Sequence, residues 1–287
     1  MAIEMKIDPI AFTIGPFAVG WYGIMVALAV VTIVTWALLS VKRDPRLSSD
    51  AVLNAALVGI PSGIIFARLL HVFDNVVVAK LHPELVASGA VTDYFQHPAL
   101  IFGGSGLTIW GAVLGAALGI WIYSRLRKIS FGYIADMLAP GIILAQAVGR
   151  VGCTILGDDT GLPTSLPWGF IYTSPNSPTN MAVGLTPTQP VVVYEIFYAL
   201  ILFGILMMLR KRLRPDGSLF LVYLAFYAAW RLGGDFLREG TPFLFGLHQA
   251  QVISVIILII SLTLIALRTR WVKKVEGDKE GGQEPAA

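Results

Sequence analysis

Three arginines lie at the ends of long apolar segments, where a charge is costly. They are Arg68, Arg150 and Arg231. An arginine in the middle of a membrane costs about 3 kcal/mol on insertion scales, so such residues usually face the interior of a helical bundle and mark a site. The planar guanidinium group matches a phosphate through paired hydrogen bonds. The pattern therefore indicates an anion site, and the anion present at that depth is a phospholipid headgroup.

Acidic residues are interleaved with these arginines. Arg231, Asp235 and Arg238 follow at i, i+4 and i+7, which places them on one face of a helix. Asp158 follows Arg150, and Glu195 opens the next apolar segment. The alternative is that the arginines reach to lipid headgroups, or form buried pairs that only fix packing, such as Arg231 with Asp235. Interleaved acids and glycines favour a site for the set as a whole, because arginines that merely reach the interface do not need them.

The composition places the chain in a membrane. Hydrophobic residues make up 56% of it and charged residues 14%, with a mean hydropathy of +0.73. Soluble domains have about 25% charged residues. The single cysteine, Cys153, excludes an intrachain disulfide, and no Cys/His spacing resembles a zinc site. We therefore expect no metal, no cofactor and no nucleic-acid partner.

Seven apolar segments are long enough to cross a bilayer, which takes about 20 residues. They are 17–40, 51–72, 100–123, 133–151, 190–209, 218–236 and 247–267. Basic residues gather after the first, third and fifth segments and in the tail, whereas connections 73–99 and 152–189 hold only Lys80. Since basic loops stay in the cytoplasm, this predicts an outer N-terminus and an inner C-terminus. The first segment is expected to be an uncleaved anchor.

These segments predict an all-α integral membrane protein. Residues 1–272 form one seven-span domain, and residues 273–287 form a disordered cytoplasmic tail. Connections 73–99 and 152–189 are expected on the extracytoplasmic side of the membrane. The second is long enough to form a small subdomain that carries function. The three arginines are then expected to converge at the outer leaflet.

The stretch "AVGRVGCTILGDDTG" resembles the signature of prolipoprotein diacylglyceryl transferases. That pattern runs Gly-Arg-Ile/Val-Gly-Asn, then Gly-Glu and a further Gly. Other stretches match in the family's order: "GWYGIMVALA", "GIIFARLL", "IFGGSGLTIWGAVLG", "QPVVVYE", "RLGGDFLRE" and "QAQVISV". The predicted topology also agrees with the family. The order of the motifs is more specific than any one of them.

The resemblance implies transfer of a diacylglyceryl group from phosphatidylglycerol to the lipobox cysteine of a prolipoprotein, at the outer leaflet of a bacterial plasma membrane. It implies that Arg150 contacts the lipid headgroup, that Arg231 stabilises the leaving group and that Tyr22 positions the substrate. Asp158 takes the place of the signature glutamate as a catalytic acid. The remaining residues expected to bind phosphatidylglycerol are Arg68, Gly152, Gly157, Gly161, Glu195 and Asp235.

The chain departs from the family pattern at positions that bear on the chemistry. Where the family has Ile-His-Gly-Gly, this chain has Trp110, and an indole cannot accept a proton. Cys153 replaces the signature asparagine and is expected to be a small buried residue. Trp110 is expected to pack or to lie at the interface. The candidate replacement base is His71.

Three other groups stay open as the base, although each has a simpler interpretation. His97 and Asp159 fit a solvated loop or a cap, and Asp158 fits the signature acid. Two other functions also stay open. A non-catalytic relative would bind anionic lipid or lipoprotein precursors. An anion transporter would need helix breaks in matching halves; breaks are expected at Pro61 and Pro140, but no matching halves are found.

Overall fold

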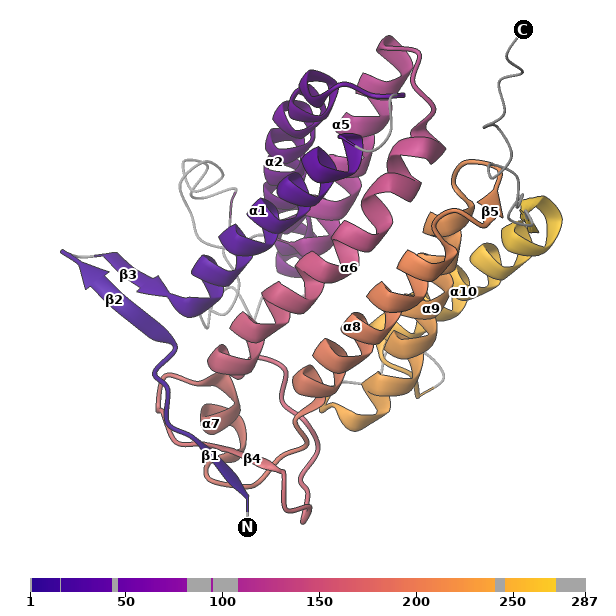
Figure 1. Cartoon of the computed structure of the whole chain (residues 1–287). Helices are drawn as coiled ribbons and strands as arrows, with labels where there is room; N and C mark the ends of the chain where they lie inside the picture. The colour runs from indigo at the N-terminus through magenta and orange to yellow at the C-terminus, as the bar shows by residue number, and fades with distance from the viewer. Residues whose placement is uncertain are drawn as a thin grey trace, which may run out of the picture. The chain divides into compact units, whose positions relative to one another are not determined.

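A computed structural model of the chain describes residues 2–15, 17–42, 46–81, 94, 108–240 and 246–271 (Figure 1). The chain divides into two compact units, and each is described by itself. One unit is Ala37–Phe131, and the other combines Met1–Trp36 with Gly132–Ala287. Both are mostly helical. Six of the described helices are long and apolar enough to cross a membrane, which agrees with an integral membrane protein.

The larger unit is built around three helices. They are α6 (Phe131–Leu156), α8 (Val191–Leu209) and α9 (Ser218–Gly234). Their shared core contains Ile143 from α6, Leu202 and Leu206 from α8, and Leu219 from α9, each at most 2% exposed. Helix α10 (Gln249–Arg268) packs on α9, and the buried Gln251 side chain donates to the Leu232 carbonyl at 3.3 Å. This packing fixes the helix ends from which the site is made.

Two helix boundaries differ from the predicted ones for a local reason. Helix α1 (Trp21–Val41) begins four residues later than predicted, because Phe17–Gly20 is strand β3 and pairs with β2 (Ile10–Ile14). Helix α6 continues five residues beyond the predicted end. Arg150 and Cys153 therefore lie inside the last turns of α6, and the side chains that face its neighbours are set by helical geometry.

A folded layer formed by residues after α6 covers one end of this unit. Strand β4 (Phe170–Tyr172) pairs in parallel with β1 (Ile3–Met5), and α7 (Pro178–Val183) follows it. At the opposite end, where Figure 1 labels β5, strand β5 (Leu213–Arg214) pairs with β6 (Arg270–Trp271). The prediction of an all-α protein misses these short two-stranded sheets.

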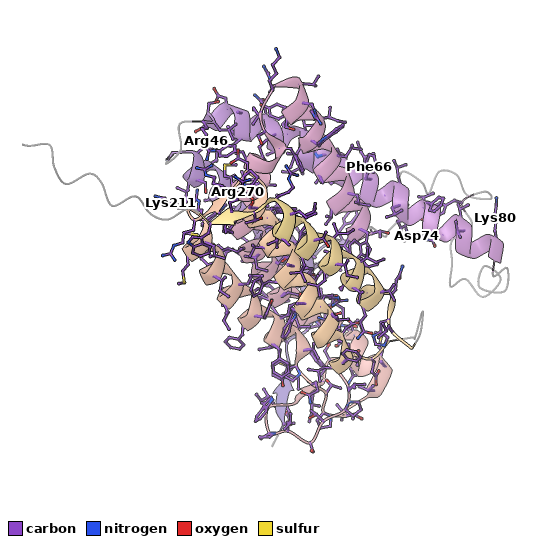
Figure 2. All side chains as sticks on the ribbon, turned by 90° about the vertical axis from the view of Figure 1, so that its right-hand side faces the viewer. Arg46, Phe66, Asp74, Lys80, Lys211 and Arg270 are labelled. Carbon is purple, nitrogen blue, oxygen red and sulfur yellow. The ribbon has the colours of Figure 1, made fainter. Side chains whose placement is uncertain are left out.

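Several basic residues of the larger unit lie at the β5 end, where Figure 2 labels Lys211 and Arg270. The Arg212 guanidinium lies 5.8 Å from the centre of the Trp271 ring there. Helix α10 ends at Arg268 on the same side. A group of lysines and arginines outside the site thus lies at one end of the unit, and the layer of β1, β4 and α7 lies at the other (Figure 1).

The smaller unit is a close pair of helices, α2 (Ser49–Leu81) and α5 (Ile109–Leu126). Glycines at 111, 115 and 119 face α2, and a Cβ atom there would collide with Phe66 or Ser62. The Ser62 hydroxyl donates to the Gly115 carbonyl at 2.6 Å. Small residues at i and i+4 let two helices approach closely, as in membrane helix pairs. These glycines are therefore explained by packing.

Several predictions about both units need correction. Residues 73–81, predicted as the start of a loop, continue α2, which Figure 2 follows from Phe66 past Asp74 to Lys80. The helices also continue through Pro61 and Pro140, so the predicted breaks are wrong. His97, residues 100–107 of the third predicted segment and the tail 273–287 lie outside the described residues.

Candidate functional site

Four charged side chains close a ring at the end of α6. Arg150 Nη1 donates to Asp159 Oδ2 at 2.6 Å, and its Nε donates to Glu195 Oε1 at 2.8 Å. Arg238 Nη1 donates to Asp159 Oδ1 at 2.5 Å, and its Nη2 donates to Glu195 Oε2 at 2.6 Å. Each carboxylate thus bridges both guanidinium groups. We call Arg150, Asp159, Glu195 and Arg238 the charged ring.

Local backbone pairing brings the ring together. Arg150 lies on α6 and Glu195 on the second turn of α8, whereas Asp159 and Arg238 lie on the segments that follow α6 and α9. These two segments are joined where Leu162 N–H donates to the Leu237 carbonyl at 2.9 Å and Glu239 N–H donates to the Thr160 carbonyl at 3.0 Å. The pairing places the Asp159 carboxylate between the two guanidinium groups.

Burial makes the ring an electrostatic unit. The side chains of Arg238 and Glu195 are only 6% and 4% exposed, while those of Arg150 and Asp159 are 20% and 25% exposed. Interactions between charges strengthen as water is excluded, and breaking such a pair by removing one partner costs about 3–5 kcal/mol. The ring carries two positive and two negative charges, so it is formally neutral without a ligand.

A second group of charges adjoins the ring through Asp235. This buried carboxylate lies in the 3₁₀ turn η1 (Asp235–Leu237) after α9. It is 3.5 Å from Arg231 Nη2, 4.0 Å from Arg238 Nε and 2.9 Å from His248 Nδ1. Arg231 is thus connected to the ring by way of Asp235. Sequence spacing alone placed Arg238 on the same helical face as Arg231, but the turn redirects Arg238 into the ring.

Two guanidinium donors of this cluster are unused. Among the described residues, Arg238 Nε and Arg231 Nη1 are buried and donate no hydrogen bond. An unsatisfied buried donor costs about 1–3 kcal/mol, more when it is charged. Such a cost is removed when an acceptor binds, and a phosphate oxygen is the acceptor that matches a guanidinium group.

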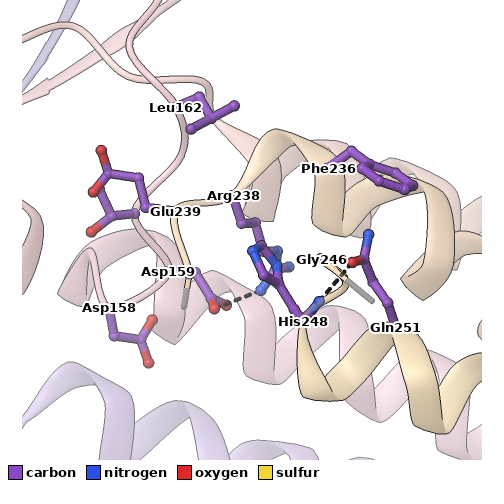
Figure 3. A pocket seen from close by; sticks show the side chains of 11 residues that line it. Asp158, Asp159, Leu162, Phe236, Arg238, Glu239, Gly246, His248 and Gln251 are labelled. Atoms are coloured by element: carbon purple, nitrogen blue, oxygen red, sulfur yellow. Dashed lines mark hydrogen bonds and ion pairs between the residues drawn. The ribbon is translucent and has the colours of Figure 1, made fainter. Parts of the chain in front are cut away.

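A cavity of about 760 Å³ opens beside the ring (Figure 3). Its charged wall is formed by Asp158, Asp159, Arg238, Glu239 and His248, and apolar contacts come from Leu162 and Phe236. Figure 3 shows the Asp159–Arg238 ion pair at the centre of this wall. A polar headgroup with an apolar remainder fits a cavity of this mixed character.

The two adjacent aspartates have different surroundings. Both oxygens of Asp159 are bound by arginines, whereas Asp158 forms no ion pair within the described residues. Loss of water around the carboxyl and the neighbouring charge of Asp159 raise the pKa of Asp158 above its usual value. Asp159 is therefore not the solvated or capping residue that the sequence suggests.

A cation is a poor fit to the acids at the end of α6. Ligand atoms of Cys153, Asp158 and Asp159 lie within 4.8 Å of one another. The two Asp159 oxygens already accept from arginines, however, and Arg150 Nη1 also lies 3.7 Å from the Cys153 sulfur. Cys153 is buried at 7% exposure, as the sequence predicts. The donors around these atoms suit an anion.

The glycines predicted to admit the lipid are in close contact with protein. A Cβ at Gly152 would lie 2.9 Å from Met25 Cβ and 3.1 Å from Tyr22 Cα, which also places Tyr22 against α6 beside the site. A Cβ at Gly157 would meet Ser177 and Tyr172, and its φ of +69° favours glycine. A Cβ at Gly161 would meet the Gln189 carbonyl. Packing accounts for all three, and lipid contact there stays a prediction.

Three predicted residues lie in the smaller unit, so the structure does not relate them to the ring. The Arg68 guanidinium lies 5.6 Å from the centre of the buried Tyr94 ring. His71 contacts its own helix, with Asn75 Nδ2 donating to the His71 carbonyl at 2.9 Å. Trp110 is 43% exposed. The convergence of Arg68 with Arg150 and Arg231 stays a prediction.

Comparisons with known proteins agree with the family resemblance of the sequence. A family model described as prolipoprotein diacylglyceryl transferase matches residues 9–267. A curated relative from Dehalococcoides mccartyi, named phosphatidylglycerol–prolipoprotein diacylglyceryl transferase, is 43% identical over 95% of this chain and 98% of its own length. Relatives of the same name from Symbiobacterium thermophilum and Clostridioides difficile are 33% and 32% identical, over 93% and 87% of this chain and 94% and 90% of their own lengths.

Proposed function

Because the chain belongs to the prolipoprotein diacylglyceryl transferase family, we propose that the charged ring and the adjoining cavity are where it transfers a diacylglyceryl group from phosphatidylglycerol to a prolipoprotein cysteine. The match over nearly the whole chain supports an enzyme over a lipid-binding relative or an anion transporter. The observation that carries the site is a pair of arginines held by shared carboxylates, with spare N–H groups beside a cavity.

The reaction sets two demands on the site: donors must stabilise the leaving phosphate, and a base must take the proton of the thiol. The cysteine sulfur forms a bond to the glyceryl carbon that carries the phosphate, and the bond from that carbon to the phosphate oxygen breaks. Glycerol phosphate leaves with the electron pair of the broken bond, and the thiol loses its proton. Donors fixed in advance at the oxygen where negative charge grows lower the barrier most, because they need no rearrangement during the reaction.

Arg150 and Arg238 meet the first demand in this proposal. Their guanidinium groups are held in place by Asp159 and Glu195, so the arginines do not have to be ordered by the lipid. The two carboxylates balance the charge of the two arginines. An anion can therefore bind only at an N–H group that does not already donate to a carboxylate. The phosphate therefore binds beside Arg238, which lines the cavity and has a spare Nε donor, and Arg231 on the other side of Asp235 supplies a further spare donor.

The other residues that the family pattern selects keep proposed roles around this centre. Arg231 stabilises the leaving group, Tyr22 positions the substrate, and Asp158 acts as an acid at the cavity wall. Glu195 and Asp235 hold the arginines. Arg68 is a further headgroup contact, Gly152, Gly157 and Gly161 shape the approach of the lipid, and His71 is the alternative base.

The orientation follows from the distribution of charge in the larger unit. The basic β5–β6 end faces the cytoplasm, and the ring end faces the outer leaflet of the bacterial plasma membrane, where secreted prolipoproteins present their lipobox. Seven helices of 17 residues or more lie in the described part of the chain, and all seven cross the bilayer in this proposal. The N-terminus is then outside and the C-terminus inside.

A direct assay tests the function. Purified protein in phosphatidylglycerol vesicles is incubated with a peptide that contains a lipobox cysteine, and the peptide mass is measured. We expect a gain of one diacylglyceryl group and release of glycerol phosphate. A peptide with serine in place of cysteine is the control and should stay unmodified. An unchanged mass for the cysteine peptide, together with failure to support cells depleted of their own transferase, would refute the function.

The adjacent aspartates offer a matched test of the site. Asp159→Asn removes a charge that bridges two arginines but leaves an amide oxygen that can accept from one of them, so we expect lower activity and a loss of about 1–3 kcal/mol in the free energy of unfolding, the cost of one unsatisfied buried donor. Asp158→Asn removes an acid from the cavity wall without breaking an ion pair, so we expect a lower kcat with an unchanged Tm. Thermal unfolding in detergent and steady-state kinetics distinguish the two. Equal stability losses would contradict the assignment of Asp159 to the ring.

A further inference from the structure

His248 combines features of a proton acceptor that the motif pattern does not select. It precedes α10 directly, and its backbone N–H donates to the Gln251 side chain at 2.9 Å. Its Nδ1 lies 2.9 Å from Asp235 Oδ2, and its side chain is 22% exposed. His248 is therefore held by its backbone N–H and by one ring nitrogen, while part of the imidazole stays accessible.

The contact with Asp235 selects the form of the imidazole. A carboxylate oxygen can only accept at that position, so Nδ1 carries the proton and donates it, and in the neutral imidazole the lone pair is then on Nε2. Among the described residues, Nε2 makes no hydrogen bond. A carboxylate that fixes the tautomer and orientation of a histidine is the arrangement that serves general bases in other enzymes.

The position of the ring joins it to the proposed reaction centre. His248 lines the same cavity as Asp159 and Arg238, as Figure 3 shows. The imidazole also lies against Gly240, where a Cβ would be only 3.0 Å from Cε1. The charged ring would hold the leaving phosphate on this cavity wall. The neutral nitrogen is thus placed beside the space that the acceptor thiol must enter.

We propose that His248 is the general base that removes the proton from the acceptor cysteine, a role that Trp110 cannot take. The inference rests on the proposed function. The thiol proton moves to His248 Nε2, the sulfur electron pair forms the new bond to carbon, and the glycerol phosphate leaves with the electrons of the broken bond. The imidazolium then returns its proton to the phosphate or to water, so neither an oxidant nor a cofactor is needed.

The charged groups around His248 suit the transfer of the thiol proton to it. Asp235 faces Nδ1 from the turn after α9, with Arg231 behind it, and Arg238 and Glu239 follow on the same segment. Asp158 and Asp159 line the cavity from the segment after α6. The Asp235 carboxylate lies directly against the imidazole, so an imidazolium formed during the reaction would have an ion-pair partner already in place.

The sharpest test uses the pH dependence of a variant that keeps the Asp235 contact. In His248→Asn the side-chain amide can still donate to Asp235, but no group is left to accept a proton. We expect kcat at pH 7 to fall about 10²- to 10³-fold with little change in KM. An ordinary thiol has a pKa of about 8.5, so thiolate forms without a base as the pH rises. The deficit should therefore shrink markedly by pH 9.

A purely structural role gives a different pattern. Loss of packing would lower the rate equally at pH 7 and pH 9 and would lower Tm, and either result would overturn the proposal. His71→Asn is the comparison: if it shows the deficit that alkaline pH relieves and His248→Asn does not, the base is His71. His248→Gln is a second variant in case His248→Asn does not fold, and wild-type turnover in either folded variant refutes the role. An inactive wild-type protein would instead overturn the function itself.

Discussion

Arg150→Ala is expected to abolish measurable transfer, with a loss of about 10³-fold or more in kcat/KM. The variant removes donors to Asp159 and Glu195 and leaves both carboxylates with only Arg238 as a partner. Truncating one member of a buried ion pair costs about 3–5 kcal/mol, so Tm should fall as well. Activity loss alone would therefore not separate chemistry from folding.

Arg150→Lys separates these two effects. A lysine keeps the positive charge but not the planar fork that binds Asp159 and Glu195 together. We expect this variant to regain a large part of the lost stability while transfer stays at least 10²-fold below wild type. Arg212→Ala is the matched control, since Arg212 lies at the β5 end beside Trp271 and should leave transfer unchanged. A wild-type rate for Arg150→Lys would show that only charge matters at this position.

The sequence predicts Arg150 and Glu195 as site residues because each stands at a point where an apolar segment meets charge. It does not predict which of two adjacent aspartates meets the arginines. Asp158 matches the family signature, but the backbone after α6 turns so that Asp159 occupies the ring. That turn is fixed by long-range pairing of Thr160 and Leu162 with the segment after α9, which no local pattern reveals.

Arg238 and His248 were missed for a similar reason. The i, i+4, i+7 spacing assumes a continuous helix, but the 3₁₀ turn at Asp235 ends α9, and Arg238 has extended backbone with φ of −107° and ψ of 150°. His248 is 13 residues from Asp235 and lies outside helix α9, so no helical or strand period connects them. The sequence shows that these charged residues are present, but which acid each one meets is decided by tertiary contacts.

The long helices themselves were predictable because a membrane span needs only length and apolar character. Their ends were not. Residues 17–20 are as apolar as the helix that follows, yet they pair with Ile10–Ile14, and hydropathy cannot distinguish these two structures. The extension of α2 to Leu81 includes Asp74 and Lys80, two charges that a hydropathy criterion assigns to a loop.

A neutral ring raises the question of how a lipid phosphate would bind where two carboxylates already occupy the arginines. The spare donors Arg238 Nε and Arg231 Nη1 allow binding without displacing either carboxylate. Asp159 and Glu195 then act as supports that hold the guanidinium groups at a fixed angle. On this basis the carboxylates should affect chiefly kcat, since they prepare the arginines for the transition state more than they contact the lipid.

Arg238→Ala is therefore expected to have an effect as large as that of Arg150→Ala. Arg238 is 6% exposed, bonds to both ring carboxylates, approaches Asp235 and lines the cavity. We expect kcat to fall about 10³-fold with a smaller change in KM, since the lost interaction strengthens as the leaving group gains charge. Steady-state kinetics in phosphatidylglycerol vesicles would measure this split.

The comparison with Arg231→Ala decides between the two arginines of this segment. Among the described residues Arg231 forms an ion pair only with Asp235, at 3.5 Å, so its loss should lower kcat less than the loss of Arg238. The double variant Arg150→Ala/Arg238→Ala should be hardly slower than either single variant, because each one alone already breaks the ring. Additive losses would mean that the two arginines act independently. A larger effect at Arg231 would place the leaving group on the far side of Asp235 from the ring.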